Sequence, residues 1–169
     1  MKTFNPLNVS SKFAICGVPI RVDTYKSCSF GCKYCFANNR VVCEFGKELQ
    51  VANLNQLERK LKQIFEKGEV DKTNFLDTLI ADEITWHCGG MSDPFQPVEK
   101  KYHITRDMID ICNRYGTSIL FSTKSDTVHD ANIRPDLHTF QLSISNIDNR
   151  KDIEPNVPDI EKGINFIKN

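Results

Sequence analysis

Apolar residues at helical spacing alternate along this chain with short apolar and β-branched runs. Leu54, Leu57 and Leu61 recur three and four residues apart, as they would on one face of a helix. Asn53 with Gln56 three residues later is typical of a helix start, and Gly68 of a helix end. This spacing predicts helices at residues 53–68, 73–81 and 105–116, a weaker one at 128–134, and a last one from Pro158.

Four other segments are predicted to be strands, at residues 15–25, 84–88, 118–124 and 139–145. Strands that alternate with helices indicate an α/β fold with a largely parallel sheet. The last strand places Gln141, Ser143 and Ser145 on one face, which is either exposed or lines a barrel interior that holds a cofactor. Residues 1–13 are expected to be irregular, and residues 41–45 are β-prone without a secure place.

Composition and charge bear on the number of domains, on binding to nucleic acid and on the location of the protein. The 169 residues (19.4 kDa) fit a single domain, residues 1–169. Twenty-two basic residues balance twenty-two acidic ones, so no overall charge would recruit nucleic acid. We expect neither a secretory signal nor a membrane span, and seven irregularly spaced cysteines fit a reducing, cytoplasmic location.

The candidate chemistry begins at Cys28, Cys32 and Cys35, spaced CxxxCxxC directly after the first predicted long strand. A 4Fe-4S cluster is usually held by four cysteine thiolates, so three leave one iron open for chemistry. Ligands of α/β folds bind beyond the carboxyl ends of the strands, where this loop lies. The spacing therefore favours an open iron-sulfur cluster.

Two other interpretations of the cysteines stay open. A structural zinc site could combine the Cys32 and Cys35 pair with further ligands from Cys16, Cys43, His87 or Cys88. A thioredoxin-like CxxC pair would belong near a βαβ pattern, but it leaves Cys28 without a role.

Further candidates follow the later strands. Gly89 and Gly90 end the second predicted strand, where glycine lets the backbone approach a ligand closely, although such a pair is also common in ordinary turns. Lys124 ends the third strand and can reach back over the mouth of the sheet, although most lysines are solvated.

Together these segments resemble the DNA-repair photolyase-like branch of the radical S-adenosylmethionine superfamily, which includes relatives of spore photoproduct lyase. The resemblance runs from about Cys28 to Ile167 and rests on Cys28–Phe36, Ser92–Tyr102, Ser122–Ser125, and Ser143–Ser145 followed by Glu154-Pro155. It implies a partial (β/α) barrel of about four units where the family has six. The barrel would be apparently truncated, with a second chain as a possible partner to complete it.

The resemblance also implies cofactors and a reaction. Cys28, Cys32 and Cys35 would bind a 4Fe-4S cluster, and Tyr34 would border the adenine of S-adenosylmethionine. Further contacts to that cofactor would come from Gly89, Gly90, Met91, Ser92, Lys124, Ser143 and Ser145. A flavodoxin- or ferredoxin-type donor would reduce the cluster, and cleavage of the cofactor would yield a 5'-deoxyadenosyl radical. That radical would abstract hydrogen from a substrate that the resemblance does not identify, with DNA as the candidate.

The chain departs from the family near Ser92. In the lyase a cysteine just before the Ser-Asp pair returns a hydrogen atom to the product, whereas this chain has Gly90 there. Cys88 would share the face of Gly90 if the strand continued, which makes it a candidate hydrogen donor. The alternative function is a non-catalytic binding module, stabilised by zinc or an iron-sulfur cluster, or an inactive fragment that needs a partner chain.

Overall fold

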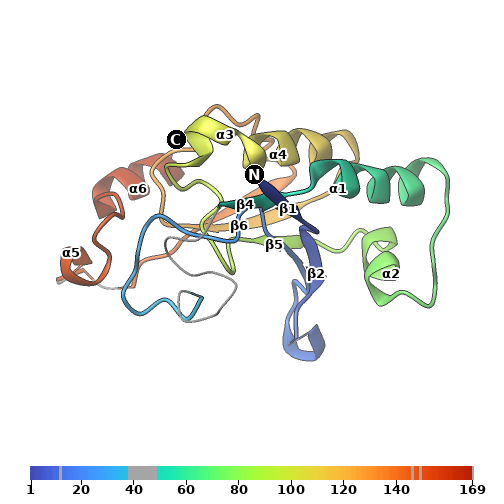
Figure 1. Ribbon diagram of the computed structural model, residues 1–169, viewed down its shortest axis with the longest axis horizontal. Helices are drawn as coiled ribbons and strands as arrows, with labels where there is room; N and C mark the ends of the chain where they lie inside the picture. Colours follow the sequence, from blue (N-terminus) through green and yellow to red (C-terminus); the bar gives the residue numbers. More distant parts are fainter. Residues whose placement is uncertain (12, 38–48, 146, 149, 169) are drawn as a thin grey trace.

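The main layer of the computed structural model is a five-stranded sheet in the order β2-β3-β5-β6-β7 (Figure 1). The structure describes residues 1–11, 13–37, 49–145, 147–148 and 150–168. β3, β5, β6 and β7 run parallel, and β2 pairs antiparallel with β3. The strands of this sheet are β2 (Leu7–Val9), β3 (Ile20–Val22), β5 (Trp86–Cys88), β6 (Ile119–Thr123) and β7 (His138–Leu142).

The four predicted long strands are found as β3, β5, β6 and β7, each shorter than expected. The expectation of an irregular start is wrong, because β1 (Lys2–Phe4) pairs with β4 (Gln50–Ala52) in a second parallel sheet and β2 joins the main one. β1 and β2 are separated by Asn5 and Pro6, so neither lies within a longer run of alternating apolar and polar residues that would predict it. The β-prone residues 41–45 lie outside the described residues.

The predicted helices are found except one. α1 (Leu54–Leu61) continues as the π-helical turn η2 (Lys62–Glu66), and the side chain of Asn53 accepts a hydrogen bond from the backbone N–H of Gln56. No helix forms at residues 128–134, where His129 and Asp130 have positive φ and Pro135 disfavours a helical residue before it. The remaining helices are α2 (Phe75–Ala81), α3 (Glu99–Tyr102), α4 (Ile104–Arg114), α5 (Arg150–Ile153) and α6 (Ile160–Lys168).

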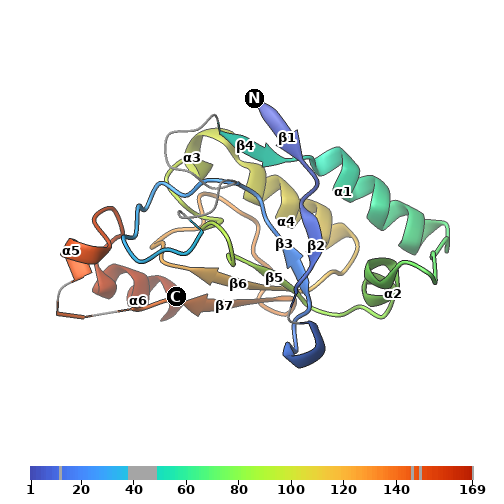
Figure 2. The ribbon, with the colours of Figure 1, turned by 60° about the horizontal axis from the view of Figure 1, so that its bottom comes forward.

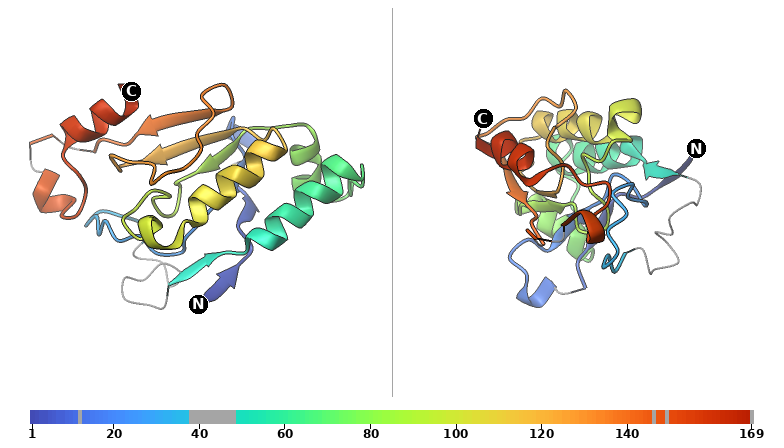
Figure 3. Two further views of the ribbon diagram at one scale, coloured as in Figure 1. Left: turned by 90° about the horizontal axis from the view of Figure 1, so that it is seen from above. Right: turned by 90° about the vertical axis from the view of Figure 1, so that its left-hand side faces the viewer.

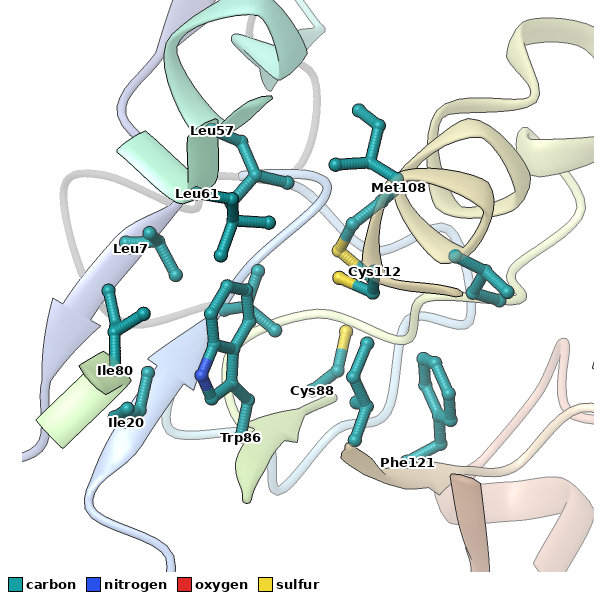
Figure 4. Close-up of a cluster of buried hydrophobic side chains, with 14 of the residues drawn as sticks. Leu7, Ile20, Leu57, Leu61, Ile80, Trp86, Cys88, Met108, Cys112 and Phe121 are labelled. Carbon is teal, nitrogen blue, oxygen red and sulfur yellow. The ribbon is translucent and has the colours of Figure 1, made fainter. Parts of the chain in front are cut away.

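Helices cover one face of the main sheet and bury its apolar side chains (Figures 2 and 3). Trp86 and Cys88 of β5 point toward Leu61 of α1 and toward Met108 and Cys112 of α4 (Figure 4). α6 packs against the apolar face of the edge strand β7, where the rings of Phe140 and Phe166 have centroids 5.8 Å apart. None of the described helices is long and apolar enough to cross a membrane.

The opposite face of the main sheet carries polar side chains. His87 Nε2 lies 2.9 Å from Ser122 Oγ, which in turn donates to Gln141 Oε1 at 3.3 Å. Within the described residues β7 pairs only with β6, so the sheet is open at this edge. The structure establishes a mixed α/β fold with a mainly parallel sheet, and it does not establish a partial barrel.

Candidate functional site

A pocket of about 110 Å³ lies where the chain leaves the parallel strands. Its lining comes from the cysteine loop after β3, the two-glycine loop after β5, the end of β6 and the residue after β7. Predicted site residues in this lining are Cys28, Cys32, Tyr34, Cys35, Gly89, Gly90, Met91, Ser92, Lys124 and Ser143. The fold thus gathers residues from Cys28 to Ser143 around one small cavity, leaving Ser145 and Cys88 outside its lining.

Gln96 holds the cysteine loop at the backbone on both sides of Cys28. Its side chain is 1% exposed, and Nε2 donates to the carbonyl of Ser27 at 2.8 Å. Oε1 accepts from the backbone N–H of Ser29, also at 2.8 Å. The loop conformation therefore depends on Gln96, which lies 67 residues after Ser29 in the chain. No role of its own was predicted for Gln96 from the sequence.

The environment of Cys28 and Cys32 disfavours free thiolates. Burial raises the pKa of Cys28 to about 12. Burial also raises the pKa of Cys32, the Glu154 carboxylate adds to the shift, and the Lys124 ammonium opposes it. A bound metal ion deprotonates a coordinating thiol outright. Thiolates at these positions would therefore depend on a positively charged partner such as a metal centre.

The residues that the structure describes do not assemble the single-ion zinc site that the cysteine spacing left open. In the part of the chain that the structure describes, no three side chains of His, Cys, Asp or Glu lie close enough for one ion. Of the proposed zinc ligands, Cys88 lies in the core, Cys16 Sγ hydrogen bonds to the carbonyl of Val18, and Cys43 lies outside the described residues. The thiolates that hold a cubane bind different irons, so they need not converge on one point.

Asp93 joins the loop after β5 to the end of β6. Oδ1 accepts from the backbone N–H of Phe95 at 3.0 Å and from Thr123 Oγ1 at 2.8 Å. Oδ2 accepts from the backbone N–H of Lys124 at 2.6 Å. Burial raises the pKa of Asp93 to about 6, although these donors favour the charged form. This carboxylate fixes where Lys124 leaves the strand.

Gly89 allows two strand ends to meet. Its φ is +109°, and a Cβ at this position would lie 2.0 Å from the carbonyl oxygen of Ser122 on β6. The two glycines predicted that the backbone would come close to a ligand. At Gly89 the backbone does make a close approach, but to the neighbouring strand β6. No side chain larger than hydrogen fits without moving β5 or β6.

The expectation that Cys88 and Gly90 share a face is wrong. Cys88 is 1% exposed and lies in the core with Met108 and Cys112 (Figure 4). A Cβ at Gly90 would instead lie 3.5 Å from the ring of His87, on the opposite face. The positive φ of Gly89 interrupts the alternation of the strand, and burial holds the pKa of the Cys88 thiol well above its usual range.

The polar residues predicted at the ends of β6 and β7 converge on Glu154. Lys124 Nζ lies 2.7 Å from Glu154 Oε1 and donates to the carbonyl of Ser143 at 3.1 Å. Ser145 Oγ donates to Glu154 Oε1 at 2.6 Å, and the hydroxyl of Tyr34 donates to the same oxygen. Burial opposes the charge of Lys124, but Glu154 and Tyr34 raise the pKa of the ammonium above its usual value.

Ser92 and Glu99 make hydrogen bonds to the segments that flank the site. The hydroxyl of Ser92 donates to the carbonyl of Tyr25 at 2.7 Å, which leaves its oxygen as an acceptor. Glu99 is fully buried, accepts from the hydroxyl of Tyr25, and caps α4 by accepting from the backbone N–H groups of Thr105 and Arg106 at 3.0 and 2.9 Å. Negative charge at a helix N-terminus is stabilising.

Comparisons with known proteins support the fold. No family model matches the chain. An uncharacterized protein of Methanocaldococcus jannaschii is 29% identical over 178 residues, a match that covers 99% of this chain and 60% of the relative. Three variants of spore photoproduct lyase superpose with TM-scores of 0.65 to 0.67 at 13 to 15% identity.

The match to spore photoproduct lyase covers 96% of this chain and 44% of the lyase chain. One of the variants was solved with bound AdoMet and dinucleoside spore photoproduct. The chain therefore has the fold of part of spore photoproduct lyase, and it spans less than half the length of that chain.

Proposed function

We propose that this chain carries the cofactor-binding part of a radical S-adenosylmethionine enzyme. The observation that carries the proposal is the convergence of Cys28, Cys32 and Cys35 with Gly89–Met91 and Lys124 on one pocket. Similarity of fold to spore photoproduct lyase, one variant of which binds AdoMet, supports it. A zinc module would use the cysteines but would not need the glycine turn or Lys124.

In this proposal the three thiolates hold a 4Fe-4S cluster, and Gly89–Met91, Lys124 and Ser143 bind S-adenosylmethionine beside it. The reduced cluster would supply the electron that cleaves this cofactor to methionine and a 5'-deoxyadenosyl radical, which removes hydrogen from the substrate. The protein's own contribution is to hold the cysteine loop through Gln96 and to orient Lys124 through Asp93.

The partners follow as part of the same proposal. A flavodoxin- or ferredoxin-type protein would deliver the electron. Nucleic acid is the proposed substrate class, on the analogy of the lyase variant with its dinucleoside photoproduct. The open edge of β7 is the proposed place for a strand from a second chain, since unpaired strand edges favour pairing with another chain.

The test is anaerobic reconstitution with iron and sulfide of the wild-type chain, Cys32→Ala and Cys16→Ala. Cys16 is the matched control because its thiol hydrogen bonds locally to Val18 and does not line the pocket. We expect about four irons per chain in the wild type and in Cys16→Ala, and loss of the cluster in Cys32→Ala. Full iron and sulfide in Cys32→Ala, or one zinc ion and no iron in the wild type, would overturn the proposal.

A further inference from the structure

Glu154 is a buried carboxylate that gathers donors from three separate segments. Its side chain is fully buried and forms ion pairs with Lys124 on one side and with Arg150 on the other, at 2.7 and 3.0 Å. Ser145 and Tyr34 donate their hydroxyls to it as well. Burying a carboxylate is costly unless it is paired and hydrogen-bonded, and four donors meet that requirement here.

The segment around Glu154 lies against the cysteine loop. α5 and the loop after β3 are neighbours in Figures 1 and 2, and the backbone N–H of Lys33 donates to the carbonyl of Ile153 at 2.8 Å. Asn156 Nδ2 donates to the carbonyl of Ser29 at 3.2 Å. One backbone hydrogen bond and one from the Asn156 side chain thus already attach this segment to the loop, so a buried charge is not needed for attachment alone.

The charge of Glu154 acts on two groups that face the pocket. Lys124 has a long, flexible side chain, and the ion pair together with the Ser143 carbonyl orders its ammonium before any ligand arrives. The ring of Tyr34 is half exposed, and the bond from its hydroxyl to Glu154 fixes it, with Lys124 Nζ 5.8 Å from the ring centroid. A ligand that meets ordered side chains loses less affinity to their immobilisation.

We propose that Glu154 is a positioning residue that orders Lys124 and Tyr34 for S-adenosylmethionine and sets the charge beside the cluster at Cys32. The inference rests on the proposed function. Negative charge near an iron-sulfur cluster disfavours its reduced form, and positive charge favours it. Glu154 therefore lowers the reduction potential of the cluster and Lys124 raises it, whereas both residues strengthen cofactor binding.

The experiment compares reconstituted Glu154→Gln and Lys124→Met with the wild type. Both variants keep the three cysteines and should assemble the cluster, and both should bind S-adenosylmethionine about tenfold more weakly. The midpoint potential should become more positive in Glu154→Gln and more negative in Lys124→Met. Glu161→Gln, the same chemical change at an exposed position of α6, should alter neither quantity.

The double variant tests whether Glu154 acts through Lys124. If it does, Glu154→Gln combined with Lys124→Met should weaken cofactor binding by less than the product of the two single effects, because the part that acts through Lys124 is lost only once; fully multiplicative effects would overturn the ordering of Lys124. If Glu154→Gln does not fold, Tyr34→Phe decides the inference, because it keeps the ring and removes only the bond to Glu154: weaker binding of S-adenosylmethionine is expected, and an unchanged affinity would overturn the ordering role.

The outcomes separate this inference from the proposed function. A wild-type cluster that responds to S-adenosylmethionine, with the potential and affinity of both variants unchanged, would overturn the role of Glu154 alone. Potentials that move in the same direction in both variants would also overturn it, because they would indicate a general loosening of the loop. A wild-type chain that assembles no cluster would overturn both proposals.

Discussion

Replacing Gly89 by alanine tests whether the pocket depends on close contact between the ends of β5 and β6. The added Cβ would lie 2.0 Å from the carbonyl oxygen of Ser122 and 2.9 Å from its carbonyl carbon, whereas real Cβ atoms essentially never come within 3.0 Å. The two strand ends would have to separate by about 1 Å, the difference between 3.0 and 2.0 Å. The contact is with backbone, so rotation of a side chain cannot relieve it.

Two terms set the size of the effect. An alanine at the φ of +109° costs about 1–2 kcal/mol of conformational strain. Displacing packed backbone to admit an extra carbon costs about 1–3 kcal/mol more. We therefore expect Gly89→Ala to lower the free energy of unfolding by about 2–5 kcal/mol, a large share of the roughly 5–15 kcal/mol that stabilises a typical domain.

Urea unfolding followed by tryptophan fluorescence measures this effect, because Trp86 is the single tryptophan and lies buried on β5 close to the change. Gly116→Ala is the matched control, since its φ is +65° with no atom within 4 Å of the added carbon. It should lose only the strain term, about 1–2 kcal/mol. Gly90→Ala, with ordinary contacts, should change little. Equal losses in Gly89→Ala and Gly116→Ala would refute the close-contact argument.

Three further predictions concern the groups that support the site and the edge strand. Gln96→Leu should lower the free energy of unfolding by about 2 kcal/mol in urea titrations, because the buried Gln96 side chain loses two hydrogen bonds to the cysteine loop; an unchanged midpoint would contradict this. Tyr25→Phe should lower the free energy of unfolding by a similar amount, about 2 kcal/mol, because buried Glu99 loses a donor. Urea unfolding should show a smaller loss in the control Tyr115→Phe, which removes an exposed hydroxyl. Burial lowers the pKa of His138 from 6.5 to about 4, so the unfolded chain binds the proton more tightly than the folded one. The free energy of unfolding should therefore fall by about 2 kcal/mol as the pH is lowered from 8 to 5. His138→Gln should remove this contribution to the pH dependence of stability.

Elements that lie within longer patterned segments were predictable from the sequence, whereas isolated short ones were not. The leucines of α1 and the cap at Asn53 are local signals, and both are found as expected. α3 and α5 are four residues each, too short for helical periodicity to show. The weak helical pattern at residues 128–134 was misleading because the turn at His129 and the following Pro135 outweigh it.

The candidate site was predictable where its residues follow strand ends. Cys28, Gly89 and Lys124 lie at the carboxyl ends of neighbouring parallel strands, so the topology brings them together. Gln96 and Glu154 belong to segments that carry the resemblance, but their roles depend on contacts 67 and 120 residues away. Nothing local to a polar residue reveals that it is fully buried, which is why these two were missed.

The central claim is tested most directly by electron paramagnetic resonance of the reconstituted, dithionite-reduced chain with and without S-adenosylmethionine. An open iron held by Cys28, Cys32 and Cys35 predicts a reduced-cluster signal that shifts when the cofactor is added. A cluster signal that is the same with and without the cofactor, or a chain that binds zinc and assembles no cluster, would contradict the account.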